Sequence, residues 1–123
     1  MKLTVELVPS SSWGANLRKE LPKATWDVLR RSQYAQAGYV CEICKGRGPR
    51  HPVECHEIWH YDDQTCVQTL KGLIALCPAC HSVKHIGLAF VQRRGEKAVA
   101  HLMKVTGWSP EETAAYIEMA FTI

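Results

Sequence analysis

Apolar and polar positions alternate at the start of the chain. Leu3, Val5 and Leu7 are apolar with polar side chains between them, and the run stops at Pro9 and the serines that follow. Alternation with a period of two is typical of a strand that buries one face. We therefore expect a strand over residues 2–8.

The middle of the chain predicts a helix and then a strand that leads into another helix. The first helical run, which contains Trp26, lies between Pro22 and Gly38, residues suited to open and to close a helix. The apolar run 73–76 is typical of a strand or hairpin arm. Pro78 follows it closely and is well placed to begin the next helix.

Two helices are expected in the last third of the chain. The first covers about residues 96–105 and ends near Gly107, and its apolar side consists of Ala98, Val99, Leu102 and Val105. The second begins at Ser109, whose hydroxyl can cap a helix with Pro110 in its first position, and continues to Phe121. The pattern as a whole predicts an α+β fold.

Composition fits one packed globular domain over residues 1–123. Apolar residues make up 46% of the 123 residues, and no stretch approaches the length of a membrane span. The formal net charge of +3 is mild, so it permits a nucleic-acid partner without requiring one. Basic side chains are clustered, and one cluster, Lys45 to Arg50, directly follows a cysteine pair.

Four cysteines form two C-x-x-C pairs, Cys41 with Cys44 and Cys77 with Cys80. Two such turns supply the four sulfur ligands of a structural Zn²⁺ site. Two disulfides are the alternative, but the segment 1–6 carries charges where the apolar core of a signal peptide would lie. We therefore expect a reducing cytoplasm, in which such pairs hold metal.

Histidines near these pairs suggest a second, reactive site. His81 and His85 are four residues apart in the helix expected after Pro78, so they share one helical face and can bind one metal ion. His56, between the cysteine pairs, is expected on a hairpin opposite that helix. A divalent ion beside a neutral imidazole suits phosphodiester hydrolysis, with His56 as the base that takes a proton from water.

These residues resemble the HNH endonuclease family. The resemblance rests on Cys41-x2-Cys44, on the run 54–58 (Glu-Cys-His-Glu-Ile), and on the run 73–85, which ends in Cys-Pro-Ala-Cys-His-x2-Lys-His, and it covers roughly residues 38–86. It implies a zinc-braced, treble-clef-like ββα-metal centre, with an N-terminal strand and helix over 1–37 and two helices over 87–123. It also implies metal-dependent cutting of DNA, with Mg²⁺ or another divalent metal, and gives His56 the role of general base, with His81 and His85 as the helix histidines.

The sequence departs from the family pattern at two positions. Gly72 stands where the family has the asparagine that holds the base-bearing loop, and Cys55 stands where it has an acidic metal ligand. Nearby side chains that can substitute are the acidic Glu54, Glu57, Asp62 and Asp63 for the ligand, and Gln64 and Gln68 for the loop.

Several roles therefore stay open. His56 can instead be a histidine bonded within the sheet, or a zinc ligand together with Cys55, and His81 can support the cysteine thiolates. Arg47, Arg50 and Lys84 are the expected phosphate contacts, whereas His51 and His101 receive no role and Cys66 is expected to be a free thiol.

The expected function is a metal-dependent endonuclease. The alternatives are a catalytically degenerate module that binds nucleic acid or a protein without cutting, and a structural zinc domain for protein assembly. DNA is the expected partner, RNA stays open, no membrane is expected, and the oligomeric state is not predicted.

Overall fold

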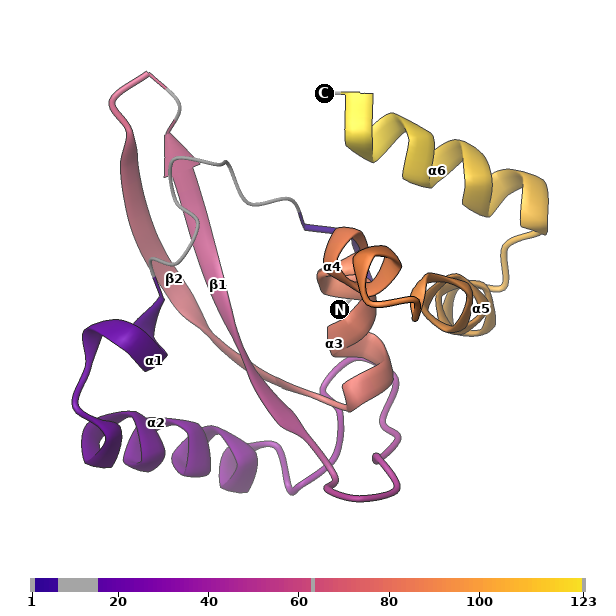
Figure 1. Cartoon of the computed structure of the whole chain (residues 1–123). Coiled ribbons are helices and arrows are strands. Elements are labelled where there is room, and N and C mark those ends of the chain that lie inside the picture. Colours follow the sequence, from indigo (N-terminus) through magenta and orange to yellow (C-terminus); the bar gives the residue numbers. More distant parts are fainter. Residues whose placement is uncertain (1, 7–15, 63, 123) are drawn as a thin grey trace.

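The computed structural model describes residues 2–6, 16–62 and 64–122 (Figure 1). Within these residues the fold is α+β, as predicted, and consists of one two-stranded sheet with helices around it. The elements in chain order are α1 (Leu17–Glu20), α2 (Lys23–Gln36), β1 (Glu54–Asp62), β2 (Val67–Leu76), α3 (Pro78–Lys84), α4 (Ile86–Val91), α5 (Gly95–Thr106) and α6 (Pro110–Thr122). None of the helices in the described residues is long and apolar enough to cross a membrane.

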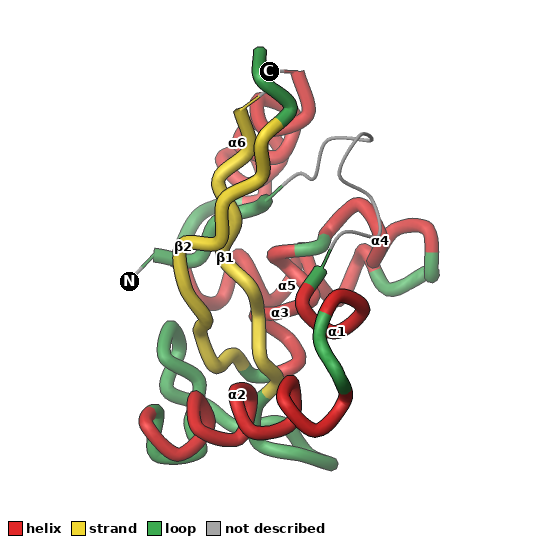
Figure 2. The backbone as a smooth tube through the Cα atoms, turned by 90° about the vertical axis from the view of Figure 1, so that its left-hand side faces the viewer, coloured by secondary structure: helices red, strands yellow, loops and turns green. Residues whose placement is uncertain are grey.

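Strands β1 and β2 form an antiparallel hairpin between two groups of helices. Helix α2 crosses one side of the hairpin, and α3 and α5 lie on the other (Figures 1 and 2). Because successive side chains of a strand point to opposite faces, neighbours on β1 meet different helices. The hairpin therefore decides which side chains reach α3.

The hairpin is buried at one end and exposed at the other. Glu54 pairs with Leu76 at the buried end, where Ile74, Ala75 and Leu76 are covered. The register shifts between Ile58 and Trp59, where Gly72 lies opposite Ile58. Beyond this bulge β2 is mostly exposed up to the turn. The hairpin thus has an anchored base and a projecting end.

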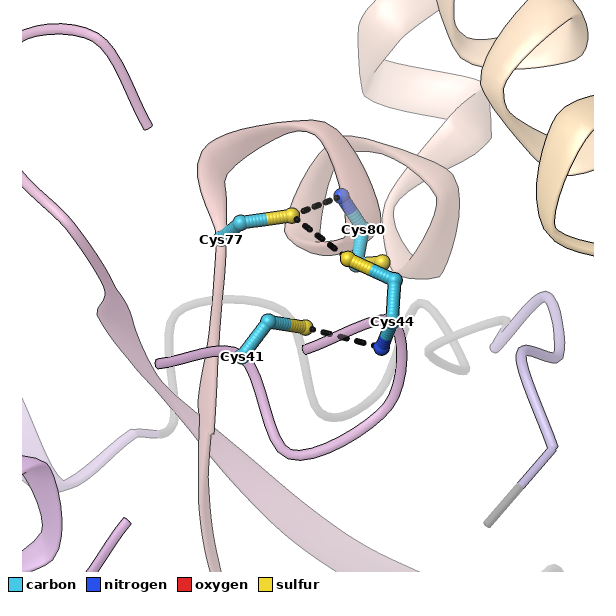
Figure 3. Close-up of side chains that lie close together, drawn as sticks. All are labelled: Cys41, Cys44, Cys77 and Cys80. Carbon is cyan, nitrogen blue, oxygen red and sulfur yellow. Dashed lines mark hydrogen bonds between the residues drawn. The ribbon is translucent and has the colours of Figure 1, made fainter. Parts of the chain in front are cut away.

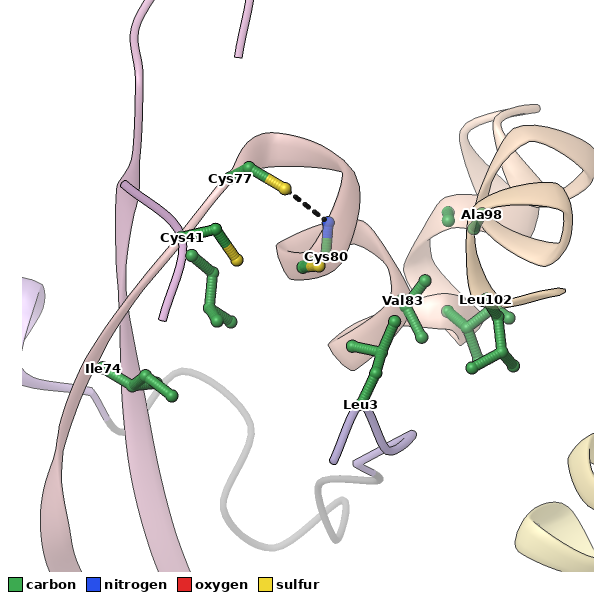
Figure 4. Packing of buried hydrophobic residues seen from close by; sticks show 11 residues of the cluster. Leu3, Cys41, Ile74, Cys77, Cys80, Val83, Ala98 and Leu102 are labelled. Atoms are coloured by element: carbon green, nitrogen blue, oxygen red, sulfur yellow. Dashed lines mark hydrogen bonds between the residues drawn. The ribbon is translucent and has the colours of Figure 1, made fainter. Parts of the chain in front are cut away.

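The core lies between the base of the hairpin, α3 and α5 (Figure 4). Val83 of α3 packs in one cluster with Ala98 and Leu102, which lie one turn apart on α5. The buried hydrophobic positions of this cluster are Leu3, Cys41, Ile74, Leu76, Cys77, Cys80, Val83, Ile86, Ala89, Ala98 and Leu102. Three of the four cysteines expected to bind zinc are therefore part of the core, and Cys44 packs against it.

The helix ends follow the sequence signals. Gly107 closes α5 with a φ of 76° and donates its N–H to the Met103 carbonyl at 2.8 Å. Before α6, the Ser109 hydroxyl accepts from the Glu112 N–H at 3.1 Å, and the Glu112 carboxylate accepts from the Ser109 N–H at 3.2 Å. Both predicted C-terminal helices are confirmed.

The predicted N-terminal strand is wrong for the residues described. Residues 2–6 belong to no strand, and positions 7 and 8 lie outside the described residues. The alternation does separate buried Leu3 from exposed Thr4. However, the Val5 N–H donates to the Tyr116 hydroxyl and the Glu6 N–H to the Lys84 carbonyl, so this segment docks on helices.

Two short helices were not expected from the sequence. Helix α4 forms although it contains Gly87, because Ile86 and Ala89 are fully buried against the core. Helix α1 has four residues, and the Asn16 side chain caps it by accepting from the Lys19 N–H. Burial thus overrides the low helix propensity of glycine in α4.

Gly48 is a position at which a larger side chain should destabilise the fold. A Cβ there would overlap the His51 carbonyl oxygen and would lie 2.6 Å from Cδ of Pro78, the first residue of α3. We expect Gly48→Ala to lower the free energy of unfolding by about 1–3 kcal/mol in chemical denaturation. Gly72→Ala is the control, because a Cβ at Gly72 meets nothing within 4 Å. Equal stability of the two variants would contradict this packing.

Candidate metal centre

Four cysteine sulfurs meet where the hairpin joins α3 (Figure 3). Cys41 and Cys44 come from the loop after α2, and Cys77 and Cys80 from the start of α3. The four Sγ atoms lie within 4.8 Å of one another, and those of Cys44 and Cys77 are 3.6 Å apart. The two pairs predicted to share a metal are therefore together.

Backbone N–H groups point at these sulfurs. The Cys44 N–H donates to Cys41 Sγ and the Cys80 N–H to Cys77 Sγ, both at 3.4 Å, and the Gly46 N–H donates to Cys44 Sγ at the same distance. Such bonds stabilise thiolates. A hydrogen bond from the Cys80 thiol holds the pKa of Cys41 well below its ordinary value.

The cluster fits a zinc ion. Tetrahedral coordination with Zn–S bonds of about 2.3 Å places sulfurs about 3.8 Å apart, close to the Cys44–Cys77 separation of 3.6 Å. All six cysteines are free of disulfides. The cysteines can therefore hold a closed structural zinc site.

His101 of α5 completes this cluster, although the sequence analysis gave it no role. Its Nε2 lies 3.1 Å from Cys80 Sγ, within reach for an N–H to donate to a thiolate. The signal in the sequence was its place beside Ala98, Leu102 and Val105 on the side of the helix expected to be apolar. His81, the residue expected to support the thiolates in one alternative, bonds elsewhere.

Three histidines form a second cluster beside the first. His56 lies on β1, His81 on α3 and His85 at the C-cap of α3. Their ring centroids are 5.2 Å apart for His56 and His81, and 5.0 Å apart for each pair with His85. One ring nitrogen of each lies within 4.8 Å of the others, so the imidazoles can hold a metal ion. The structure thus places His56 opposite the helix histidines.

Carboxylates contact two of these rings. Glu54 Oε1 lies 3.0 Å from His81 Nδ1, and a Glu6 carboxylate oxygen bonds His56 Nε2. An ionised carboxylate only accepts hydrogen bonds, so these two nitrogens carry the hydrogen in neutral rings. His81 Nε2 and His56 Nδ1 then keep their lone pairs.

The electrostatics keep the carboxylates charged and His85 neutral. The hydrogen bond from His81, with a second from His51, lowers the pKa of Glu54 to about 2 despite its burial. Burial lowers the pKa of His85 to about 4, and the neighbouring His81 and His56 act in the same direction. A neutral His85 can offer a nitrogen lone pair to a metal at neutral pH.

The other residues considered for the acidic ligand lie away from this cluster. Cys55 points to the opposite face of β1 from His56, and burial raises its pKa to about 11. Glu57 accepts from the Leu17 N–H at 2.5 Å, and Asp62 accepts from backbone N–H groups of the hairpin turn. Asp63 lies outside the described residues. A site shared by Cys55 and His56 is therefore wrong.

The three expected phosphate contacts differ in their exposure. Arg47 and Arg50 are exposed in the loop between the first cysteine pair and β1. Lys84 is buried, donates to Thr4 Oγ1 at 2.7 Å and lies 3.5 Å from a Glu6 oxygen. The expectation for Lys84 is corrected here, because these partners occupy its ammonium group.

No family model, curated protein or solved structure matches this chain. What the protein does is therefore argued from the two clusters and their surroundings.

Removal of zinc should unfold the region around α3. We expect the purified protein to hold one tightly bound zinc ion, and Cys77→Ser to lose it together with several kcal/mol of stability, since structural zinc binding is folding energy. Elemental analysis and thermal unfolding with and without a chelator measure both. Cys66→Ser is the control, because Cys66 is exposed in the hairpin turn. Full stability in the absence of bound metal would contradict a zinc site.

His101 should slow the loss of that zinc. His101→Phe keeps a ring in place but removes the donor to Cys80, and we expect zinc transfer to a chromogenic chelator to accelerate by roughly tenfold. His101→Gln, which retains a side-chain N–H, should recover part of the slow rate. Identical rates in all three proteins would show that the contact with Cys80 does not affect the metal.

Proposed function

We propose that this protein is a metal-dependent endonuclease of the HNH type that hydrolyses phosphodiester bonds in DNA. The observation that carries the proposal is the triangle of His56, His81 and His85 between the hairpin and the helix that starts at the cysteine cluster. A hairpin followed by a helix, with a histidine from each facing the other, is the arrangement that the HNH resemblance implies. The distances between these three rings come from the structure and do not depend on the resemblance.

In this proposal His81 and His85 bind the catalytic metal and His56 moves the proton. Mg²⁺ or another divalent ion held there would neutralise charge that develops on the phosphate and the leaving oxygen. His56 Nδ1 has the free lone pair and accepts a proton from the attacking water. The Glu54 carboxylate fixes the tautomer of His81 that presents Nε2.

The role of the cysteine cluster is structural. It fixes the start of α3, so that His81, one residue after Cys80, has a defined position relative to β1. Arg47 and Arg50, exposed in the loop that follows Cys44, would contact phosphates of the bound DNA. Zinc thus supports the chemistry without taking part in it.

A degenerate module that binds nucleic acid without cutting is the second candidate. Two observations favour it: Gly72 has no side chain to brace the base-bearing strand, and Cys55, which stands where the family has an acidic ligand, lies on the opposite face of β1 from His56. In that case Arg47 and Arg50 would provide the binding and the histidines would serve stability. The two candidates differ in whether the phosphodiester bond breaks.

Nicking of supercoiled plasmid tests the proposal. We expect zinc-loaded protein to nick DNA only when Mg²⁺, Mn²⁺ or Ni²⁺ is added, and His56→Ala to reduce the rate by roughly 10²- to 10⁴-fold, as for loss of a general base. His60→Ala is the matched control, since His60 is an exposed histidine on the same strand. All proteins should have equal zinc content.

Two results would contradict the nuclease. Cleavage by His56→Ala at the parental rate would remove His56 from the reaction. Absence of cleavage by a folded, zinc-loaded parent that still binds DNA would favour the degenerate module instead.

A further inference from the structure

The segment 2–6 is attached to the core, to α3 and to α6 at several points. Leu3 is buried in the core, Thr4 Oγ1 accepts from Lys84 Nζ at 2.7 Å, and the Val5 N–H donates to the Tyr116 hydroxyl at 2.9 Å. The Glu6 N–H donates to the Lys84 carbonyl at 3.1 Å. Glu6 is thus held by its own backbone and by the three residues before it.

This attachment directs the Glu6 side chain at His56. One carboxylate oxygen bonds His56 Nε2, and the other lies 3.5 Å from Lys84 Nζ. His56 is only 3% exposed, so the surrounding protein shields its bond to Glu6. Glu6 itself is half-buried and bonds the His56 ring from the N-terminal segment.

Gly72 cannot brace the segment that carries His56, so another residue can take this role. The resemblance assigns the bracing of the base-bearing segment to an asparagine at this position, but glycine has no side chain, and a Cβ built there meets nothing within 4 Å. Gln64, one of the substitutes expected from the sequence, donates its backbone N–H to Asp62 in the hairpin turn. Glu6 lies outside the hairpin and bonds the ring of His56 directly.

We propose that Glu6 is the positioning residue of His56. Its carboxylate accepts the Nε2–H, so the ring is held in the tautomer whose Nδ1 lone pair is free to take a proton from water. This inference rests on the proposed nuclease function, and it assigns to the N-terminal segment a role that the sequence pattern did not indicate. Lys84 assists by fixing the second oxygen of Glu6.

Substitution of Glu6 by glutamine separates positioning from packing. The Gln side chain has the same size, but its NH₂ can donate to His56 Nε2 and thereby favour a hydrogen on Nδ1, the wrong tautomer. We expect Glu6→Gln to lower kcat by roughly 10- to 100-fold with KM within about twofold, and Glu6→Asp to retain more activity than Glu6→Gln. Zinc content and melting temperature should match those of the parent, as should all properties of the control Glu20→Gln, which changes an exposed residue of α1.

The outcomes distinguish this inference from the nuclease proposal. If the parent cuts and His56→Ala does not, an unchanged rate for Glu6→Gln overturns the inference alone, and a faster rate shows that Glu6 blocks His56. If no protein cuts, the imidazole nitrogen shifts in NMR spectra still decide it. We expect a hydrogen on Nε2 of His56 in the parent and a changed ratio of tautomers in Glu6→Gln, whereas identical spectra would overturn the inference.

Discussion

Mutual repulsion between thiolates is the constraint on which the rest of this fold depends. Four sulfurs within 4.8 Å of one another cannot all be charged unless a cation lies among them. Backbone N–H groups and His101 stabilise part of that charge, but a divalent ion is the group that neutralises most of it. The loop after α2, the end of β2 and the start of α3 meet at this point, so a metal ion held by the four sulfurs would fix their relative positions.

The hairpin links the cysteine cluster to the histidine cluster. Its base is anchored beside Cys77, and His56 lies two positions along β1 from Glu54, whose strand partner is Leu76. Period-two alternation directs Glu54 and His56 to the face that meets α3 and directs Cys55 to the other face. Strand β1 thus contributes two groups to one site: the ring of His56 and the carboxylate of Glu54, which bonds the ring of His81.

Local patterns predicted the parts of the molecule whose determinants are local. The cysteine spacing, the i, i+4 spacing of His81 and His85, and the start signal at Ser109 each depend on one turn of chain, and the structure has all of them as expected. Alternation at Leu3 and Val5 correctly indicated an inward and an outward side, but not the absence of a neighbouring strand. Pairing depends on residues distant in the sequence, and here the helices α3 and α6 took the place of a strand.

The interactions that the sequence did not indicate are those between polar side chains far apart in the chain. Glu6 and His56, Lys84 and Thr4, and Cys80 and His101 are each joined by a single side-chain contact with no repeating pattern to mark it.

Burial makes these contacts necessary rather than optional. Lys84 is a charged group inside the protein, and the cost of removing it from water is offset only where an opposite charge such as Glu6 lies beside it. Glu6 in turn has His56 as its other partner, so the burial of one lysine on α3 is coupled to the orientation of a histidine on β1. No buried side-chain nitrogen or oxygen within the described residues lacks a partner, which means that a change at any member of this chain of contacts leaves another member unsatisfied. The geometry of the histidine cluster is therefore set jointly by the cysteine junction on one side and by the docked N-terminal segment on the other.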